Sequence, residues 1–352
     1  MSLLPNQPKQ PNNGPGRTPA RCSLKHPNRG FPAWPSGCVF LLLLCSDLAW
    51  PVAQPIDGDA VNAPLAKRSL LLDIHGRGEH ALAVGEHGHI LLTTDNGLGW
   101  RQVLPPTRRM LTGVYLVDDR VAWVVGHQSV ILKSGDGGET WAKANAETDP
   151  EGAYLDVLFL DGQTGFIVGS YGKILFTRDG GENWTMAKQE DDPHFSHITP
   201  APDESLWLCG EFGTVWRSTD RAANWRPCMT PYEGTFFGVI PLAQGGAVVF
   251  GLRGNIFRSE DGTEWEQVES STKALLHAGL VLADGRLLLA AGAGQLLISA
   301  DAGRTFRLCA IAADNTATVT SLWQAKDGAV LLTSDKGVIR LELADLKTEA
   351  SK

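Results

Sequence analysis

Short runs of alternating hydrophobic and polar residues repeat along most of the chain, and glycine or aspartate turns separate them. One such stretch begins with Leu155-Asp-Val-Leu-Phe-Leu160, turns at 161–165 and continues with Phe166-Ile-Val168. Another run, Lys173–Thr177, follows the next turn. Short runs rich in valine, isoleucine and aromatic residues between such turns are typical of β-strands. No stretch shows helical periodicity of any length, so the pattern predicts an all-β protein.

A repeat built around a central aspartate organises these strands. Successive copies of this aspartate are 41, 43, 41, 41 and 40 residues apart. Intervals of this length are typical of the four-stranded blades of β-propellers. The six copies are Gly85–Trp100, Gly126–Trp141, Gly169–Trp184, Gly210–Trp225, Gly251–Trp265 and Gly292–Phe306.

A seventh, partial copy lies near the end of the chain. Residues Thr320–Thr333 match the first two strands of the repeat, and Asp335–Glu342 match the turn and the third strand. We expect residues 62–70 to supply the fourth strand and close the ring, because closure removes exposed sheet edges. The predicted fold is therefore an all-β, seven-bladed β-propeller of four-stranded antiparallel blades. It occupies residues 69–345, preceded by a linker and ring-closing strand at 54–68 and followed by a tail at 346–352.

Each complete copy contains the motif Ser/Thr-x-Asp-x-Gly-x-x-Trp, an Asp-box, or a variant of it. The carboxylate can accept hydrogen bonds from backbone N–H groups just ahead of it, the glycine tolerates positive φ, and the tryptophan packs between neighbouring sheets. A device that recurs six times indicates a structural role. We expect the most irregular turns at Asp220, which lacks the glycine, and at Asp261, which is one residue shorter. The structural residues are Asp95, Asp136, Asp179, Asp220, Asp261 and Asp301, with Trp100, Trp141, Trp184, Trp225 and Trp265.

The first 53 residues differ from the repeats. A basic, proline-rich segment at 1–36 precedes the apolar run Cys38–Cys45 and the small residues that end at Ala53. This order is typical of a secretory signal peptide. Asp47 interrupts the apolar region, which is short for a membrane span. We therefore expect residues 1–53 to be an export leader.

The remainder of the chain is acidic. After residue 53 it retains 26 Lys and Arg against 38 Asp and Glu, a formal net charge of −12. Such a surface disfavours nucleic acid as a general partner. Three cysteines remain, Cys209, Cys228 and Cys309, and an odd number without close spacing predicts neither a disulfide framework nor a zinc site. Nothing in the motifs implies a cofactor, a metal or a tightly bound small molecule.

The turns between the second and third strands of each blade are the candidate binding sites. In a four-stranded blade they share a face with the connections between blades, and the Asp-box turns lie on the opposite face. Simple turns use small polar residues, whereas several residues inside these Gly-x-x-Gly turns are aromatic or charged, which suits an interface. The alternative is that they only cover the hydrophobic mouth of the channel. The candidate partner-binding residues are His87, His127, Gln128, Tyr171, Phe212 and Arg253 in the turns, with Arg108 and Arg109 as a basic spot in a connection.

Asp-boxes also occur in sialidases and other glycosidases, so a glycoside hydrolase is the alternative function. Enzymes similar to sialidases require an arginine cluster, a tyrosine nucleophile beside a glutamate, and an acidic proton donor. The chain has no Arg-Ile-Pro or Arg-Leu-Pro sequence, and nothing around its four tyrosines marks a nucleophile. A binding protein predicts no acidic pair in the central channel, whereas a hydrolase predicts two carboxylates near a tyrosine or arginine.

The strand and turn sequence GFIVGSYGKILFTRDGGENW at 165–184, in an Asp-box propeller of this length behind an export signal, resembles the Ycf48/Hcf136 family of photosystem II stability and assembly factors. The resemblance covers about residues 65–345. It implies a protein without enzymatic activity that docks on a membrane-protein partner, in the family through an arginine-rich patch. We therefore expect an exported assembly or stability factor whose partner is a membrane protein or complex. Its expected location is the periplasm, or the thylakoid lumen of a photosynthetic host.

Overall fold

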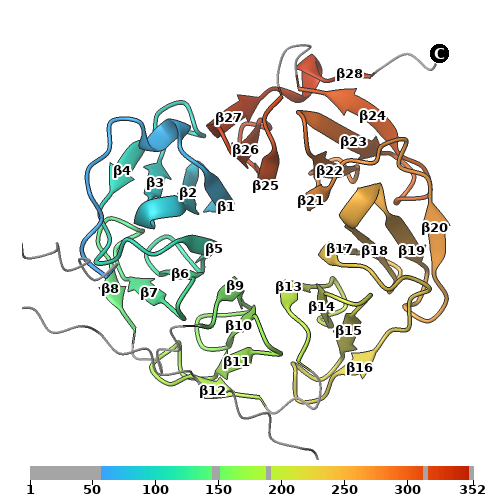
Figure 1. Cartoon of the computed structure of the whole chain (residues 1–352), viewed down its shortest axis with the longest axis horizontal. Coiled ribbons are helices and arrows are strands. Elements are labelled where there is room, and N and C mark those ends of the chain that lie inside the picture. The colour runs from blue at the N-terminus through green and yellow to red at the C-terminus, as the bar shows by residue number, and fades with distance from the viewer. Residues whose placement is uncertain (1–56, 145–150, 188–191, 312–315, 349–352) are drawn as a thin grey trace, which may run out of the picture. The chain divides into compact units, whose positions relative to one another are not determined.

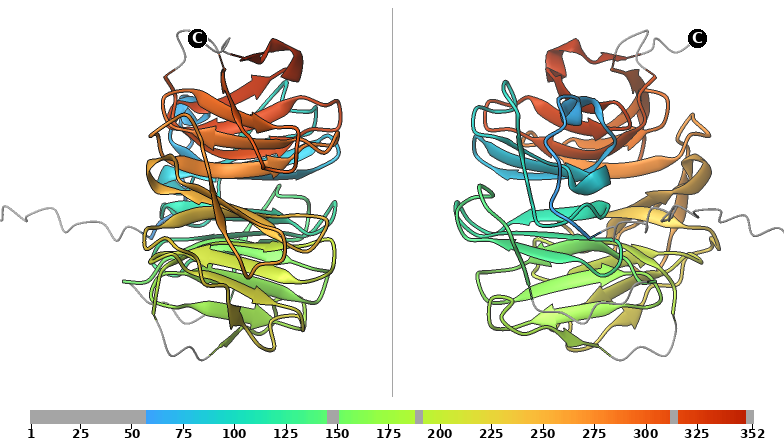
Figure 2. Two further views of the ribbon diagram at one scale, coloured as in Figure 1. Left: turned by 90° about the vertical axis from the view of Figure 1, so that its right-hand side faces the viewer. Right: turned by 60° about the vertical axis from the view of Figure 1, so that its left-hand side comes forward.

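The computed structural model describes residues 57–144, 151–187, 192–311 and 316–348, which belong to one compact unit that begins at Gln54. The predicted leader at 1–53 lies outside the described residues. Seven antiparallel sheets are arranged around a central axis (Figure 1). The first sheet along the chain lies beside the last one in Figure 1. The side views show the strands running from one face of the ring to the other (Figure 2). The seven-bladed β-propeller is confirmed.

The strands follow the order expected for a propeller, with the first strand of each blade innermost. Blades one to three contain β1 (Leu71–Arg77), β2 (His80–Gly85), β3 (Ile90–Thr93) and β4 (Arg101–Val103); β5 (Leu111–Leu116), β6 (Ala122–Gly126), β7 (Ile131–Ser134) and β8 (Ala142–Lys143); and β9 (Tyr154–Phe159), β10 (Gly165–Gly169), β11 (Ile174–Thr177) and β12 (Thr185–Met186). Blades four to six contain β13 (Phe195–Pro200), β14 (Leu206–Gly210), β15 (Val215–Ser218) and β16 (Arg226–Pro227); β17 (Phe236–Pro241), β18 (Ala247–Gly251), β19 (Ile256–Ser259) and β20 (Glu266–Val268); and β21 (Leu276–Val281), β22 (Leu287–Ala291), β23 (Gln295–Ser299) and β24 (Arg307–Ala310).

Blade seven and the short helices complete the described chain. Blade seven contains β25 (Val319–Gln324), β26 (Val330–Ser334) and β27 (Gly337–Leu341). The 3-10 helices are η1 (Ala66–Arg68), η2 (Glu86–Gly88), η3 (Leu252–Gly254) and η4 (Leu343–Asp345), and the last short strand is β28 (Lys347–Thr348).

The core consists of layers between neighbouring blades. The second strand of a blade is buried on both faces, as the uniformly buried β6, β10, β14, β18, β22 and β26 show. The buried hydrophobic residues fall into seven clusters, and each cluster joins the facing sides of two adjacent blades. Each blade therefore needs both neighbours to bury its apolar surface.

The Asp-box turns have the predicted structural role. In blade two, the Ser134 hydroxyl donates to Asp136 Oδ1 at 2.8 Å and accepts from the Gly138 N–H at 2.8 Å. Asp136 also accepts from the Thr140 N–H at 2.9 Å and from its hydroxyl. These bonds, the Thr140 hydroxyl first, lower the pKa of Asp136 to about 2. Trp141 packs into the cluster between blades one and two and donates its indole N–H to the Gly138 carbonyl at 3.0 Å.

One of the two turns expected to be irregular is regular. In blade four, Ala222 replaces the glycine in the left-handed region at φ 63°, and its N–H still donates to Ser218 Oγ at 2.9 Å. The prediction for Asp220 was therefore wrong, because the backbone bonds of the motif outweigh the strain of one alanine. In blade five the prediction is confirmed: the Thr263 N–H, two residues after Asp261 instead of four, donates to its carboxylate at 2.8 Å.

The ring closes differently from the prediction. In the described residues blade seven has three strands, and residues 62–70 form a turn, η1 and irregular backbone but no fourth strand. The Ala63 N–H donates to the Gln102 side chain of blade one at 2.8 Å, and η1 then packs beside β27 without pairing with it. The predicted tail is also partly ordered, since β28 pairs with β24 of blade six.

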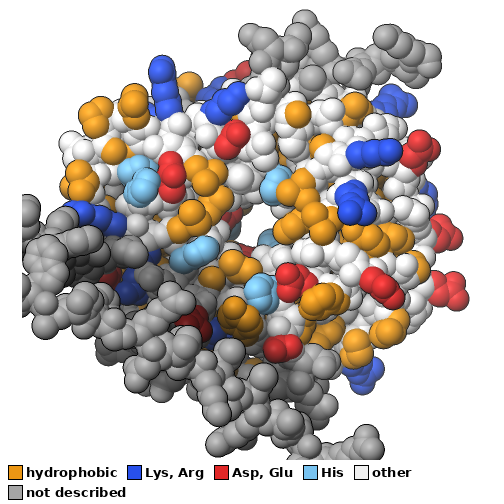
Figure 3. Space-filling view, in the orientation of Figure 1, with side chains coloured by type: hydrophobic (Ala, Val, Ile, Leu, Met, Phe, Trp, Pro, Cys, Tyr) orange, Lys and Arg blue, Asp and Glu red, His pale blue; other side chains and the backbone are white. Residues whose placement is uncertain are grey.

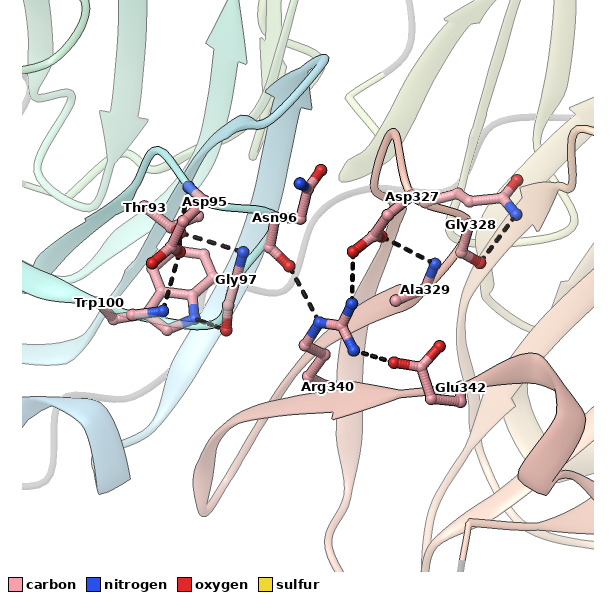
Figure 4. A network of polar contacts seen from close by, with 12 residues as sticks. Thr93, Asp95, Asn96, Gly97, Trp100, Asp327, Gly328, Ala329, Arg340 and Glu342 are labelled. Carbon is pink, nitrogen blue, oxygen red and sulfur yellow. Dashed lines mark hydrogen bonds and ion pairs between the residues drawn. The ribbon is translucent and has the colours of Figure 1, made fainter.

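Hydrogen bonds from side chains of blade seven to the backbone of blade one join the two ends of the ring. The Thr320 hydroxyl of blade seven donates to the Leu71 carbonyl of blade one at 2.7 Å. Figure 4 shows Arg340 of β27, whose Nε donates to the Asn96 carbonyl in the first Asp-box turn at 3.1 Å and whose guanidinium also pairs with Asp327 and Glu342. Arg340 thus links the last blade to the first.

Replacing Arg340 with methionine should lower the free energy of unfolding by about 1–3 kcal/mol, because it leaves a half-buried carbonyl and two carboxylates without their donor. The matched control is Arg286→Met, since within the described part of the chain Arg286 forms an ion pair only with Asp284 of its own turn, and it is more exposed than Arg340. That change should cost less than about 0.5 kcal/mol. Urea unfolding of both variants measures the difference, and equal losses would contradict a closing role for Arg340.

Candidate partner-binding face

One face of the ring carries both the Gly-x-x-Gly turns and the connections between blades. The glycine that ends such a turn packs against the following connection: the Gly213 N–H donates to the Gly234 carbonyl at 2.7 Å, and a Cβ on Gly88 would collide with the Thr107 carbonyl. We call this side the connection face. The short helices η1 and η2 belong to it and are turned toward the viewer in Figure 1. Its predicted separation from the Asp-box turns is confirmed by the strand order.

The third residue of these turns has a left-handed backbone in six blades. The residues are His87, Gln128, Tyr171, Phe212, Arg253 and Ala293, with φ between 55° and 59°. The backbone is held there because the preceding turn residue donates its N–H to the carbonyl before the first strand, as Glu86 does to Leu70 at 3.1 Å. A non-glycine residue in this region costs about 1 kcal/mol or more. Large side chains are therefore kept at positions where glycine would be less strained.

Two of these side chains are large, apolar and exposed on blades three and four. Tyr171 is 57% exposed and Phe212 75% exposed. Met229, in the connection after blade four, is 78% exposed, and the adjacent Thr230 hydroxyl donates to the Gly213 carbonyl beneath Phe212 at 3.0 Å. We call Tyr171, Phe212 and Met229 the aromatic ridge. In Figure 3, hydrophobic and histidine side chains lie around the central opening of this face.

Polar contacts support the ridge from below. The Tyr171 ring meets the edge of His194 with 4.9 Å between ring centroids. The His194 N–H donates to the Glu211 carboxylate at 3.2 Å, next to Phe212. Sequence reasoning missed His194, Glu211 and Met229, because His194 and Met229 lie in connections without a motif and the contact of Glu211 with His194 joins residues 17 positions apart.

The other predicted turn residues are distributed around the ring and do not meet in one cluster. His87, His127 and Arg253 are exposed, and Gln128 is half-buried. His87 lies 6.0 Å from His89 between ring centroids. These residues face the same side as the aromatic ridge but belong to blades one, two and five.

Arg108 and Arg109 have partners within the chain. Arg108 Nε donates to the Asp59 carbonyl at 2.8 Å. Arg109 donates to the Asp57 carboxylate at 3.2 Å and to the Gln128 carbonyl at 3.0 Å, and only 16% of its side chain is exposed. The Lys143 ammonium, with Arg109, lowers the pKa of Asp57. Arg109 therefore anchors the segment before blade one.

The central channel contains two carboxylates, contrary to the expectation for a binding protein. Asp73 and Asp156 both line a cavity of about 420 Å³, together with Tyr115 and His197. Asp73 accepts from the Ser321 hydroxyl of blade seven at 2.7 Å and from the Val114 N–H of blade two at 2.8 Å. Asp156 accepts from the Ile198 N–H of blade four at 3.0 Å and pairs with His197 at 2.7 Å. Both carboxylates thus bond blades to one another.

Burial changes the pKa values in this channel. It raises the pKa of Asp73 to about 6, with the nearby Asp156 adding to the shift. It lowers the pKa of His75 to about 4. Desolvation in the channel also lowers the pKa of His197, but the Asp156 carboxylate outweighs this and the net pKa is raised. The arrangement favours a neutral His75 at neutral pH, and the Asp156 carboxylate stabilises the protonated form of His197.

The described residues contain no group of three or more histidine, cysteine, aspartate or glutamate side chains placed to hold a metal ion. Cys209 and Cys309 are buried, Cys228 is half-buried, and no disulfide joins cysteines within the described residues. In the described part of the chain, no helix is long and apolar enough to cross a membrane.

Comparison with known proteins gives a family match. The family model described as "Photosynthesis system II assembly factor YCF48" matches residues 92–278, which is more than half of the chain. A search of the curated proteins gave no match.

Several solved structures share the fold. A structure of YCF48 bound to D1 peptide has 20% sequence identity and a TM-score of 0.66, and the match covers 80% of this chain and 95% of that one. YCF48 from Cyanidioschyzon merolae has 20% identity and a TM-score of 0.66, with 79% and 97% covered. The GH74 xyloglucanase from Xanthomonas campestris has 12% identity and a TM-score of 0.63, with 80% of this chain and 52% of that chain covered.

Asp73 should give the folded state a distinct pH dependence. Its folded pKa of about 6 lies above the value of 3.8 for an unperturbed aspartate, so the folded protein binds this proton more tightly than the unfolded chain. The resulting stability is complete below pH 3.8 and is lost as the pH rises through 6. Relative to Asp73→Asn, wild type should lose about 2–3 kcal/mol of unfolding free energy between pH 3.5 and 7. Urea unfolding across this range measures the difference, and a constant difference would contradict the assignment.

Proposed function

The chain belongs to the family of photosystem II assembly factor YCF48, and from this membership we propose that it is an assembly or stability factor that holds a membrane protein or complex through its connection face. The observation that carries the proposal is the aromatic ridge, together with the strained turn residues around it. The proposed factor uses no cofactor.

The ridge has the properties of a protein-binding surface. Exposed aromatic and methionine side chains supply large contact areas, and tyrosine and phenylalanine are enriched in interface cores. The turns hold Tyr171 and Phe212 in a left-handed backbone, so both side chains are presented on a rigid scaffold. Pre-organisation of this kind lowers the entropy cost of binding. The structure of YCF48 bound to D1 peptide supports a polypeptide as the type of partner.

We further propose that the protein has no hydrolase activity. A glycoside hydrolase needs one carboxyl group that can donate a proton to the leaving group and a second that is available at the sugar. Here both channel carboxylates accept bonds from the scaffold, and Asp156 forms an ion pair with His197. The match to a xyloglucanase supports the shared fold, not a shared site.

The proposed location is outside the cytoplasm, in the periplasm or, in a photosynthetic host, the thylakoid lumen. The support is the order of basic, apolar and small residues in 1–53. Residues 1–53 fused to alkaline phosphatase should give activity in a Gram-negative host, because that enzyme folds only after export. Replacing Leu41–Leu44 with four aspartates should abolish the activity, and activity retained by that variant would overturn the proposal.

The main test compares glycine substitutions at two strained positions. Phe212→Gly removes a ridge side chain and relieves the left-handed strain, so it should raise the free energy of unfolding by about 0.5–1 kcal/mol while reducing partner capture. The matched control, Ala293→Gly, relieves the same strain in blade six without removing a large side chain. It should stabilise the protein and leave capture unchanged.

Capture is measured as a pull-down from detergent-solubilised host membranes with the tagged chain, and thermal unfolding follows stability. One membrane partner retained by wild type and Ala293→Gly, but lost from Phe212→Gly, would support the face. Capture that is unaffected even by His87→Ala/Tyr171→Ala/Phe212→Ala/Arg253→Ala would move the site elsewhere. The absence of any partner would overturn the proposed function.

A further inference from the structure

The outermost strand of blade seven has no strand paired with its outer edge among the described residues, although η1 packs beside its start. In the described residues β27 pairs only with β26, and its backbone makes no hydrogen bond to another strand, although the Gly337 carbonyl accepts from the Ser334 hydroxyl at 2.8 Å. The other six blades each have a fourth strand of two to four residues at this position. An unpaired strand edge presents N–H and C=O groups that an extended polypeptide can pair with.

Register with the other blades identifies the open groups. Val338 of blade seven is equivalent to Ile131 of blade two. Val338 pairs with Thr333 and Ile131 pairs with Val125, and in each blade the partner on the second strand is the residue just before the first position of the turn. The Ile131 carbonyl accepts from the Ala144 N–H just beyond β8 at 3.0 Å. By this equivalence the backbone groups of Val338 and Arg340 face outward on β27, where a fourth strand would lie.

The side chains of β27 are also incompletely covered. At the positions of Val338 and Ile339, blades one, two, three, five and six bury both residues, as with Ile90 and Leu91. In blade seven both are only half-buried, and they point into the two different interblade clusters on either side. An added strand with alternating apolar residues would cover both sides.

Neither end of the described chain supplies this strand. Before η1, the Ala60 N–H donates to the Pro105 carbonyl, and Asp57 pairs with Lys143 of blade two, so the chain approaches from blades one and two. After η4, β28 adds to β24 and makes a fifth strand in blade six. The described residues therefore pass β27 on both sides without pairing with it.

Charges along the edge indicate the direction of an added strand. At the start of β27, the Lys67 carbonyl packs against Gly337, so the exposed Lys67, Arg68 and Lys336 lie near this end. None of the three forms an ion pair among the described residues. The exposed Glu342 and Asp345 follow the other end. A strand antiparallel to β27 would place its C-terminal end beside the basic residues.

We propose that β27 is a docking edge for an extended segment of the protein partner, which adds antiparallel as the fourth strand of blade seven. The segment begins with an aromatic residue, as the six built-in fourth strands follow a tryptophan or phenylalanine. It then alternates apolar residues and ends with acidic residues near Lys67 and Arg68. This inference rests on the proposed function, since it gives the same partner a second, backbone-mediated contact.

A synthetic peptide of this chemistry, Trp-Thr-Val-Thr-Val-Glu-Asp with a fluorescent label, tests the edge on the unmodified full-length chain. Strand pairing uses every second amide of the peptide. N-methylation of one alternate pair of amides should weaken binding at least about tenfold, and N-methylation of the other pair should change it little. Equal effects of both pairs, or no binding of the parent peptide, would overturn the proposal. Lys67→Gln/Arg68→Gln should also weaken the peptide severalfold, whereas Lys173→Gln, on blade three, should not.

Hydrogen exchange tells the possible occupants apart. The Val338 and Arg340 amides should exchange rapidly in the dilute chain and slow when the peptide is added. Slow exchange in the dilute chain alone would mean that the chain covers its own edge, and slowing only at high protein concentration would mean a second copy. Either result would overturn the partner proposal. Phe212→Gly should leave peptide affinity unchanged, because Phe212 lies outside β27. If the wild-type chain fails to bind the peptide but still captures a membrane partner through Phe212, the β27 inference is refuted and the proposed function is not.

Discussion

The structure depends on the burial of each blade between two neighbours. A second strand such as β10, buried on both faces, exposes apolar surface unless blades stand on either side. The ring must therefore close, although no strand of the described residues is shared between blades seven and one. Bonds between side chains and backbone join blade seven to blade one instead, from Thr320 to Leu71 and from Arg340 to Asn96. Such bonds to buried carbonyls are costly to break, because the acceptor would be left without a partner.

The same requirement explains the chemistry of the channel. The innermost strands bring N–H groups of Val114 and Ile198 to the channel wall, and Asp73 and Asp156 accept from them. A buried carboxylate is tolerated where it is hydrogen-bonded or paired, and both are. The channel that resembles an active site in its residue types is thus part of the scaffold. Residues free to meet a partner lie at the turns, where the backbone bonds leave the side chain exposed.

Local patterns in the sequence predicted the features that depend on local contacts. The Asp136 turn joins residues two to four positions apart, so its motif is visible in the sequence. Gly-x-x-Gly likewise located Phe212 and its side of the ring. Bonds such as Ser321 to Asp73 and Arg109 to Asp57 join residues 248 and 52 positions apart, and no motif marks them. The missing fourth strand is of this second type, because residues 62–70 bond to the Gln102 side chain of blade one and pass β27 as η1, without pairing with it.

Two surfaces that suit a partner open onto the same side of the molecule, the aromatic ridge and one end of β27. The ridge offers side chains without a covering layer, and β27 offers backbone groups without a strand. β27 begins at Gly337 beside η1, so the N-terminal end of β27 lies at the connection face. A segment paired antiparallel to β27 would therefore emerge on the face that carries Phe212. One extended partner could engage both surfaces, and linking two weak contacts in one chain raises the overall affinity without a new contact.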